Sequence, residues 1–286
     1  MFKKTVNTLS TVFCNFTILN FENNNFFEFM TKKNKHYSLL LIISAVLTTL
    51  ILVLTNCSSS QSIRMKNAEE YFNEAMTYFK NEDYVEAQRM FDAIKLQFPA
   101  SQYADDAQYY LAETNFKRKE FILAAFNYGS VRRIYPQSEY CKVALFKTAL
   151  CFNELSPPYD RDQDYTIKAI NAFTEYQTIY PNDSLYKLAT ENIVQLRNKL
   201  ANREYFIAEL YRKLYSPGSS LIYYDQVINE YPDTKFYEPA LFGKIEVLSE
   251  MKKTDDTRNA IDSYKKLFPN GPNINKVKFI ESSLKK

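Results

Sequence analysis

The chain has 286 residues and a formal net charge of +3, from 36 lysines and arginines and 33 aspartates and glutamates. Five of these positive residues and two of the negative ones fall within residues 1–56, so the remainder is formally neutral. A neutral remainder does not indicate the strongly basic surface expected of a protein that binds nucleic acid, so we expect no nucleic-acid partner. Tyrosine and phenylalanine are abundant, tryptophan is absent and there are only four glycines, a composition that favours helices with an aromatic core.

The first 56 residues contain the features of an export signal. Three lysines between positions 32 and 35 form a basic region, and the apolar run from Leu39 to Leu54 is too short for a comfortable membrane span. Because such a signal should begin a chain, Met30 is the natural start. We therefore interpret residues 1–29 as an extension from a wrongly assigned start codon and residues 30–56 as a lipoprotein signal peptide.

The apolar run ends in Leu54-Thr55-Asn56-Cys57, and a polar, serine-rich segment follows. This order resembles a bacterial lipobox, in which the cysteine becomes the lipidated first residue, although that pattern prefers Gly, Ala or Ser in place of Asn56. The resemblance implies acylation (palmitate) of Cys57 and a tether over residues 57–67, and several acyl chains make such anchoring stable. The alternative is an uncleaved anchor helix. Ser58 and the lack of an acidic tether favour the periplasmic face of the outer membrane of a Gram-negative bacterium.

The rest of the chain contains an aromatic–proline dipeptide five times. The successive prolines lie 37, 45, 51 and 37 residues apart, which indicates a repeat of roughly 34 residues with insertions. In the first copy, large and small residues follow the tetratricopeptide (TPR) spacing, in which two antiparallel helices interlock and a proline stops the second helix. The residues of this pattern are Tyr71, Ala75, Tyr78, Ala87, Phe91 and Pro99.

Because one such hairpin cannot bury its own apolar face, its neighbours must stack on it. We therefore predict an all-α, TPR-like right-handed superhelix of about five helix hairpins. The alternative is a set of unrelated helices that merely end in proline. The expected helices cover residues 67–80, 84–97, 105–118, 121–134, 140–153, 165–179, 185–200, 203–215, 219–230, 237–252 and 257–267, and the polar tail 271–286 is expected to be frayed or a short helix.

The sequence offers little for catalysis. The only histidine, His36, lies in the signal peptide, and no glycine-rich phosphate loop or CxxC pair is present. Cys141 and Cys151 flank one predicted helix, and ten helical residues span roughly 15 Å, too far for a disulfide. We predict no enzyme, no cofactor and no metal site, with a carboxylate-pair hydrolase as the remaining enzymatic alternative.

Peptide binding has more support, because the first helix of each TPR hairpin lines the concave groove of a superhelix. The first two of these helices contain apolar and aromatic residues beyond those that the TPR core needs, a composition suited to extended or helical peptides. The predicted groove residues are Phe72, Met76, Phe79, Tyr109, Glu113 and Phe116. The alternative is that these side chains pack against the next repeat or the tether.

A lipobox followed by five TPR-like hairpins resembles the BamD family, the lipoproteins of the outer-membrane β-barrel assembly machine, over residues 57–269. The more selective features lie in the second half of the chain. They are the Asp160-Arg161-Asp162 loop, the run from Leu196 through Glu204 to Tyr211, and Tyr231-Pro232-Asp233-Thr234. Thr257 departs from the pattern, because alanine is usual there.

The resemblance implies a periplasm-facing lipoprotein of the BAM complex. Its N-terminal repeats (68–183) would bind the aromatic-ended C-terminal segments of unfolded outer-membrane proteins. Its C-terminal repeats (184–270) would dock on the barrel subunit BamA beside other subunits of the machine. The implied docking residues are Asp160, Arg161, Asp162, Gln163, Arg197, Arg203 and Glu204.

Three alternatives remain open for these residues and for the function. The charges of the 160–163 loop could only keep an insertion soluble, or Arg161 could be clamped by the flanking aspartates and shape a docking surface. Arg197, Arg203 and Glu204 could form ordinary ion pairs between helices. The chain could also be another TPR cell-envelope adaptor lipoprotein, which coordinates division or peptidoglycan synthesis.

Overall fold

The computed structural model describes residues 35–55 and 66–284, and the chain divides into two compact units, Met1–Met65 and Lys66–Lys286. In the first unit, helix α3 (Lys35–Thr55) contains the apolar run of the predicted signal. No helix in the described residues has both the length and the apolar character that crossing a bilayer requires. The predicted lipidation residue, Cys57, lies outside the described residues, as do residues 1–34 and most of the tether.

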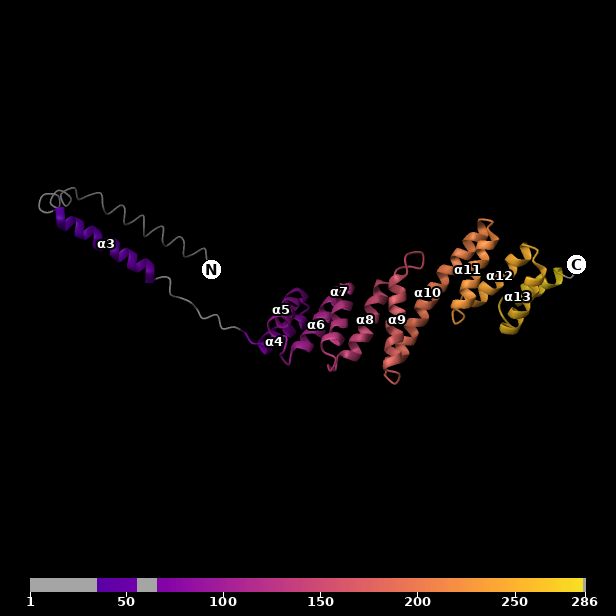
Figure 1. Cartoon of the computed structure of the whole chain (residues 1–286), viewed down its shortest axis with the longest axis horizontal. Helices are drawn as coiled ribbons and strands as arrows, with labels where there is room; N and C mark the ends of the chain where they lie inside the picture. The colour runs from indigo at the N-terminus through magenta and orange to yellow at the C-terminus, as the bar shows by residue number, and fades with distance from the viewer. Residues whose placement is uncertain (1–34, 56–65, 285–286) are drawn as a thin grey trace. The chain divides into compact units, whose positions relative to one another are not determined.

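The second unit is an all-α, TPR-like superhelix, and its described residues contain no strand. Successive helices form hairpins that follow one another in chain order (Figure 1). The helices are α4 (Ala68–Lys80), α5 (Tyr84–Gln97), α6 (Ala104–Lys117), α7 (Phe121–Ile134), α8 (Cys141–Leu155), α9 (Asp164–Ile179), α10 (Tyr186–Lys213), α11 (Pro217–Glu230), α12 (Tyr237–Glu250), α13 (Thr254–Leu267) and α14 (Ile274–Ser283).

The aromatic–proline dipeptides end the second helix of each hairpin, as predicted. In every hairpin the aromatic residue is the C-cap, and its backbone N–H still donates to the carbonyl four residues earlier. The proline that follows lacks an N–H and disfavours helical geometry in the residue before it, so the helix stops there. These C-caps are Phe98, Tyr135, Tyr180, Tyr231 and Phe268.

Small residues lie where the two helices of a hairpin cross, and large residues pack around them. The small positions of the second helices are fully buried, including the unusual Thr257. The Thr257 hydroxyl donates to the Lys253 carbonyl 2.7 Å away on its own helix, so burying it leaves no unsatisfied donor. The fifth hairpin therefore forms despite its departure from the pattern. The buried small residues of the second helices are Ala87, Ala124, Ala169, Ser220 and Thr257.

The prediction of two helices over 185–215 was wrong, because α10 is one helix of 28 residues. No proline or glycine lies between Leu200 and Arg203, so nothing interrupts the backbone hydrogen bonds there. Buried residues on both sides of this point also continue the packed face: Leu196 belongs to the core of the third hairpin, and Ala201 to that of the fourth. The tail forms a short helix, α14, one of the two outcomes expected for it.

Four of the hairpin turns contain a non-glycine residue with positive φ. Glu82, Lys119, Tyr215 and Lys252 have φ between 55° and 62° and lie between the first and second helices of their hairpins. L-residues are strained in this left-handed region, where glycine is not.

Lys119→Gly should therefore raise the free energy of unfolding by about 0.5–1 kcal/mol, because the relief of strain exceeds the added entropy of the unfolded chain. Urea unfolding of the full chain measures this difference. Gln195→Gly, in the exposed middle of α10, is the control and should lower stability by about 1 kcal/mol. A Lys119→Gly protein as destabilised as the control would contradict the assignment of strain.

Candidate functional site

The predicted groove residues of α4 are half-buried. The ring of Phe72 stacks on Tyr103 at a centroid distance of 5.2 Å, and the ring of Phe79 meets the edge of Tyr110 at 5.6 Å. Met76 also packs against the core that the first two hairpins share. This contact with the next repeat is the packing that the alternative interpretation expected. A role for these residues in binding clients stays a prediction.

One of the predicted groove residues of α6, Glu113, is a buried carboxylate. Glu113 is only 8% exposed, yet it accepts a 2.5 Å hydrogen bond from the Tyr128 hydroxyl and lies 3.0 Å from the Lys147 ammonium. Burial and the adjacent carboxylate raise the pKa of Tyr128, and the same two causes raise the pKa of Tyr109. Both phenols thus stay protonated, so Tyr128 keeps donating to Glu113 at physiological pH.

Lys147, which sequence reasoning missed, connects this carboxylate to an aromatic surface. Its ammonium lies 5.1 Å from the centroid of the Phe116 ring, within cation–π range, and 3.0 Å from Glu113. Lys147 is on α8 and its two partners are on α6, so the cluster spans the first helices of two hairpins. No spacing within one repeat could have indicated this contact, because it depends on how adjacent hairpins stack.

Cys141 and Cys151 are free thiols, in agreement with their predicted separation along one helix. Burial raises the pKa of Cys151 to about 12, so this thiol stays protonated and unreactive near neutral pH. Within the described residues, no group of three or more His, Cys, Asp or Glu side chains could hold a metal ion.

The inserted loop between α8 and α9 is braced from inside by one of its predicted docking residues. Gln163 is 5% exposed, and its amide donates to the carbonyls of Pro158 (2.8 Å) and Arg161 (2.9 Å). Asp162 accepts a hydrogen bond from the backbone N–H of Asp164 at the start of α9. The side chains of Gln163 and Asp162 therefore have structural roles in this loop. The side chains of Asp160 and Arg161 make no such contact in the described residues.

Asp160 and Arg161 form the exposed tip of this loop. No ion pair within the described part of the chain involves Arg161, so the aspartates do not clamp it. The base of the loop rests on α10: the Lys199 ammonium donates to the Ser156 hydroxyl (2.7 Å), and the Tyr159 and Phe206 rings lie 5.5 Å apart. The exposed Asp160 and Arg161 side chains thus lie on a loop whose base is held against α10.

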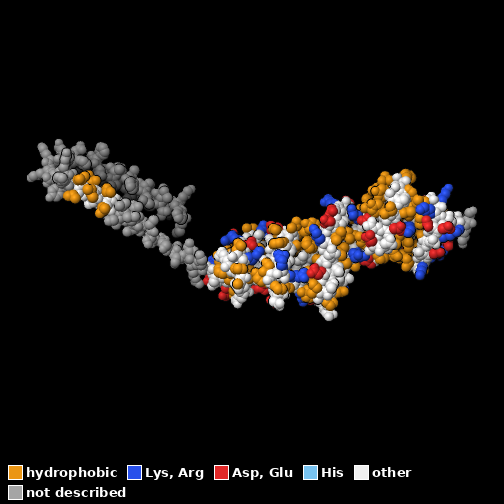
Figure 2. Space-filling model, viewed as in Figure 1, with side chains coloured by type: hydrophobic (Ala, Val, Ile, Leu, Met, Phe, Trp, Pro, Cys, Tyr) orange, Lys and Arg blue, Asp and Glu red, His pale blue; other side chains and the backbone are white. Residues whose placement is uncertain are grey.

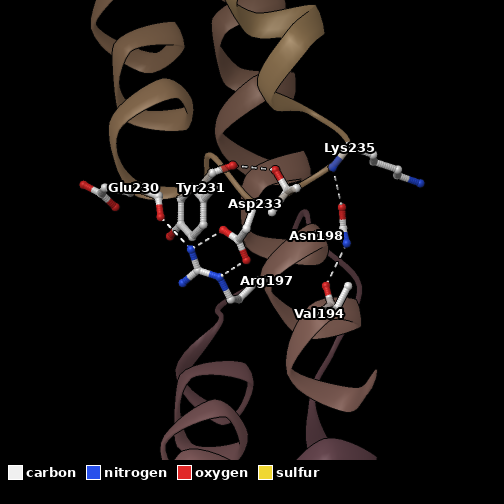
Figure 3. A network of polar contacts seen from close by, with 8 residues as sticks. Val194, Arg197, Asn198, Glu230, Tyr231, Asp233 and Lys235 are labelled. Atoms are coloured by element: carbon white, nitrogen blue, oxygen red, sulfur yellow. Dashed lines mark hydrogen bonds and ion pairs between the residues drawn. The ribbon is translucent and has the colours of Figure 1, made fainter. Parts of the chain in front are cut away.

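Arg197 of α10 binds the turn that follows α11 (Figure 3). Its guanidinium donates to both carboxylate oxygens of Asp233, at 2.7 and 2.6 Å, and to the carbonyl of Glu230 at 2.8 Å. It also lies 5.4 Å from the Tyr231 ring centroid. Hydrogen bonding to Arg197 holds the pKa of Asp233 below its usual range. Arg197 therefore forms an ion pair within the chain, although its partner lies in a turn and not on a second helix as the alternative expected.

A second contact beside it fixes the same turn. The Asn198 side chain accepts a 3.0 Å hydrogen bond from the backbone N–H of Lys235 (Figure 3). We call the contacts of Arg197 and Asn198 with residues 230–235 the α10 junction. The junction joins the first half of α10 to the turn between the last two hairpins, and so explains the Tyr231-Pro232-Asp233-Thr234 motif as a structural feature.

The other two predicted docking residues, Arg203 and Glu204, pair with each other. Glu204 is 7% exposed, and its carboxylate lies 3.4 Å from the Arg203 guanidinium. Burial raises the pKa of Glu204, although Arg203 acts in the opposite direction. Arg203 itself is exposed, so it is the member of this pair that a partner could reach.

Asp233→Asn should lower the free energy of unfolding by about 0.5–1 kcal/mol at neutral pH, because it removes a charged, bidentate contact that is partly exposed. The folded pKa of Asp233 lies below its unfolded value, which is about 3.9 for an aspartate. The stabilisation is therefore complete above that unfolded value and is lost as the pH falls through the folded pKa.

Urea unfolding across this pH range should show the native protein and the variant converging in acid. Asp255→Asn is the control: its pair with Arg258 is exposed, at 3.6 Å, and should contribute little at any pH. A difference between native protein and Asp233→Asn that persists in strong acid would assign the effect to something other than the ion pair.

Comparison with known proteins places these features in a family. Two relatives are outer membrane protein assembly factors named BamD. The protein from Pasteurella multocida is 26% identical over 214 residues, which cover 71% of this chain and 82% of the relative. The protein from Neisseria meningitidis is 27% identical over 218 residues, 72% and 80% of the two chains. Among solved structures, a TPR protein from Parabacteroides merdae aligns with a TM-score of 0.34 at 15% identity, over 75% of this chain and 73% of that one.

Residues 64–261 match the family described as "YfiO: Outer membrane lipoprotein". The matched range begins just before α4 and ends within α13, so it contains all five hairpins except the end of α13. Because this match extends over well more than half of the sequence, the chain belongs to the YfiO family of outer membrane lipoproteins.

Proposed function

We propose that the chain is a non-enzymatic assembly factor for outer membrane proteins, anchored through lipid on Cys57 at the periplasmic face of the outer membrane. Its N-terminal hairpins would bind unfolded barrel proteins, and its C-terminal hairpins would dock on the barrel subunit BamA. The observation that carries the proposal is the family match over residues 64–261, together with relatives that are themselves named as assembly factors.

The cluster on α6 and α8 supports the client half of the proposal. Phe116 is half-buried, and the Lys147 ammonium lies over its ring. A client segment that ends in an aromatic residue offers a ring to Phe116 and a terminal carboxylate to Lys147. Glu113, which accepts a hydrogen bond from Tyr128, holds Lys147 in place, so little side-chain entropy is lost when the segment binds.

The exposed charges of the second half support the docking role. Asp160 and Arg161 stand on a braced loop, and Arg203 is exposed on the adjoining part of α10. Charges at the rim of an interface steer association and select partners more than they add affinity. Arg197 belongs to the α10 junction, so its contribution would be to hold the docking surface in shape.

A TPR adaptor of cell division or peptidoglycan synthesis remains the second candidate. A family defined by outer membrane lipoproteins with TPR hairpins does not by itself identify the partner. The two candidates differ in which proteins accompany the chain from solubilised membranes, and the client test below separates them further.

A photo-crosslinking amino acid at Phe116 should capture a synthetic peptide with the aromatic-ended C-terminal sequence of a barrel protein. The same amino acid placed at Phe126, which is exposed on α7 in the same hairpin, is the matched control and should capture little. Alanine at Phe72 or Phe79 is less informative, because those rings pack in the core. Equal capture from both positions, or capture only from Phe126, would contradict the proposed client face.

The paired substitution Asp160→Lys with Arg161→Glu should reduce recovery of the barrel subunit when the chain is purified from detergent-solubilised membranes. Both side chains are exposed, so the fold should be unchanged. The matched control reverses the exposed pair on α13, Asp255→Lys with Arg258→Glu, and should leave recovery at the native level. Recovery of division proteins with the native chain, and no barrel subunit, would favour the second candidate.

A further inference from the structure

The turn between α10 and α11 exposes hydrophobic side chains. Tyr215 is 94% exposed and Leu214 is 63% exposed, and the Tyr215 side chain has no hydrogen bond or ring contact within the described residues. Leu210 and Ile222, on the two flanking helices, are exposed as well. In Figure 2 hydrophobic side chains gather on this end of the α10–α11 hairpin. We call these four residues, with Pro217 between them, the apolar corner.

The apolar corner differs from the equivalent turns of the other hairpins. The residues with positive φ there are charged, namely Glu82, Lys119 and Lys252, whereas Tyr215 has a bulky aromatic side chain at φ 55°. The chain therefore holds an aromatic residue in a strained conformation and gains little internal packing from it. Because the same strain occurs at three turns with charged residues, it is the exposed apolar patch that indicates that another surface covers this corner.

The charged residues around the apolar corner restrict the kind of surface that could cover it. Lys213 precedes the turn, and Lys252 lies in the neighbouring α12–α13 turn; both are exposed and have no ion-pair partner in the described residues. The two turns are adjacent, because Met251 lines a hollow together with Tyr215 and Pro217. The acids beside this hollow are already paired: Arg212 binds Glu246 and Glu250, each at 2.6 Å.

We propose that the apolar corner inserts into the interface of an anionic lipid bilayer. Tyrosine is enriched at the boundary between headgroups and acyl chains, because its ring is apolar and its hydroxyl is polar. Lysines beside it pair with lipid phosphates. A protruding group of apolar side chains can insert into a fluid lipid bilayer without a preformed cavity, whereas a protein partner would need a pocket of matching shape. Membership of a family of outer membrane lipoproteins makes a membrane available to the chain.

Such a contact would add a second attachment to the lipid anchor. A few interfacial side chains bind weakly alone but strengthen anchoring when combined with another membrane signal. Insertion at this turn would also set the orientation of the last two hairpins against the bilayer. The inference rests on the family match and on the corner itself, and it is independent of client binding and of BamA docking.

The absence of tryptophan makes a direct test available. The Tyr215→Trp substitution gives the full chain a sole tryptophan, and this protein should be reconstituted in vesicles of phosphatidylethanolamine and phosphatidylglycerol. We expect its emission to shift to shorter wavelength, to be quenched by lipids brominated on the acyl chain, and to be protected from acrylamide. Lys119→Trp, at a similar φ in another turn, is the matched control and should behave as an exposed residue. Leu214→Trp is a second reporter should Tyr215→Trp fold poorly.

Two results would overturn the proposal. The first is emission from the Tyr215→Trp and Leu214→Trp proteins that is as open to acrylamide as that of the Lys119→Trp control. The second is protection that arises in native envelope membranes but not in the lipid vesicles, because that result would assign the corner to a protein partner. Neither outcome depends on the assembly function, since the readout reports only the surroundings of the introduced indole.

Discussion

The structure depends on the contact between a small residue of one helix and a large residue of its partner in each hairpin. Ala75, Ala112, Ala149 and Ala208 on the first helices are fully buried, as are the small residues of the second helices. Small side chains let the helices approach closely, so that rings such as those of Phe91, Phe173 and Tyr224 fill the space between hairpins. A side chain bulkier than the alanine, serine or threonine found at these positions would push the two helices of the hairpin apart.

The same constraint sets where polar groups are tolerated. Tyr128 and Tyr224 occupy equivalent places in the second and fourth hairpins, and each donates its hydroxyl to a glutamate on the first helix, Glu113 or Glu209. The residue beside each pair differs: the Lys147 ammonium pairs with Glu113, whereas Gly243 lies against Tyr224, where an added Cβ would come within 2.5 Å of the ring. One buried framework thus supports an ion pair in the N-terminal hairpins and a closed, tightly packed contact in the C-terminal ones.

Much of the fold could be predicted because it is encoded locally. The aromatic–proline dipeptides and the alanine spacing define the hairpins within each repeat, and helix ends such as those of α5 and α7 agree with the expectation to the residue. The continuity of α10 was missed, because a repeat of about 34 residues implies a break before the fourth hairpin that no proline or glycine enforces. The candidate site was harder to predict from the sequence. Lys147 and the α10 junction depend on contacts between hairpins, which repeat spacing does not encode, and the partial burial of Phe72 and Phe79 depends on rings supplied by residues beyond their own hairpin.

We propose above all that these stacked hairpins serve the assembly of outer membrane proteins. The most direct test is depletion of the chain in the bacterium that carries it, followed by quantification of folded, heat-modifiable barrel proteins in the outer membrane. We predict that folded barrels fall while their unfolded forms accumulate in the periplasm, before any defect in division. Normal barrel levels in depleted cells that fail to divide would contradict this role.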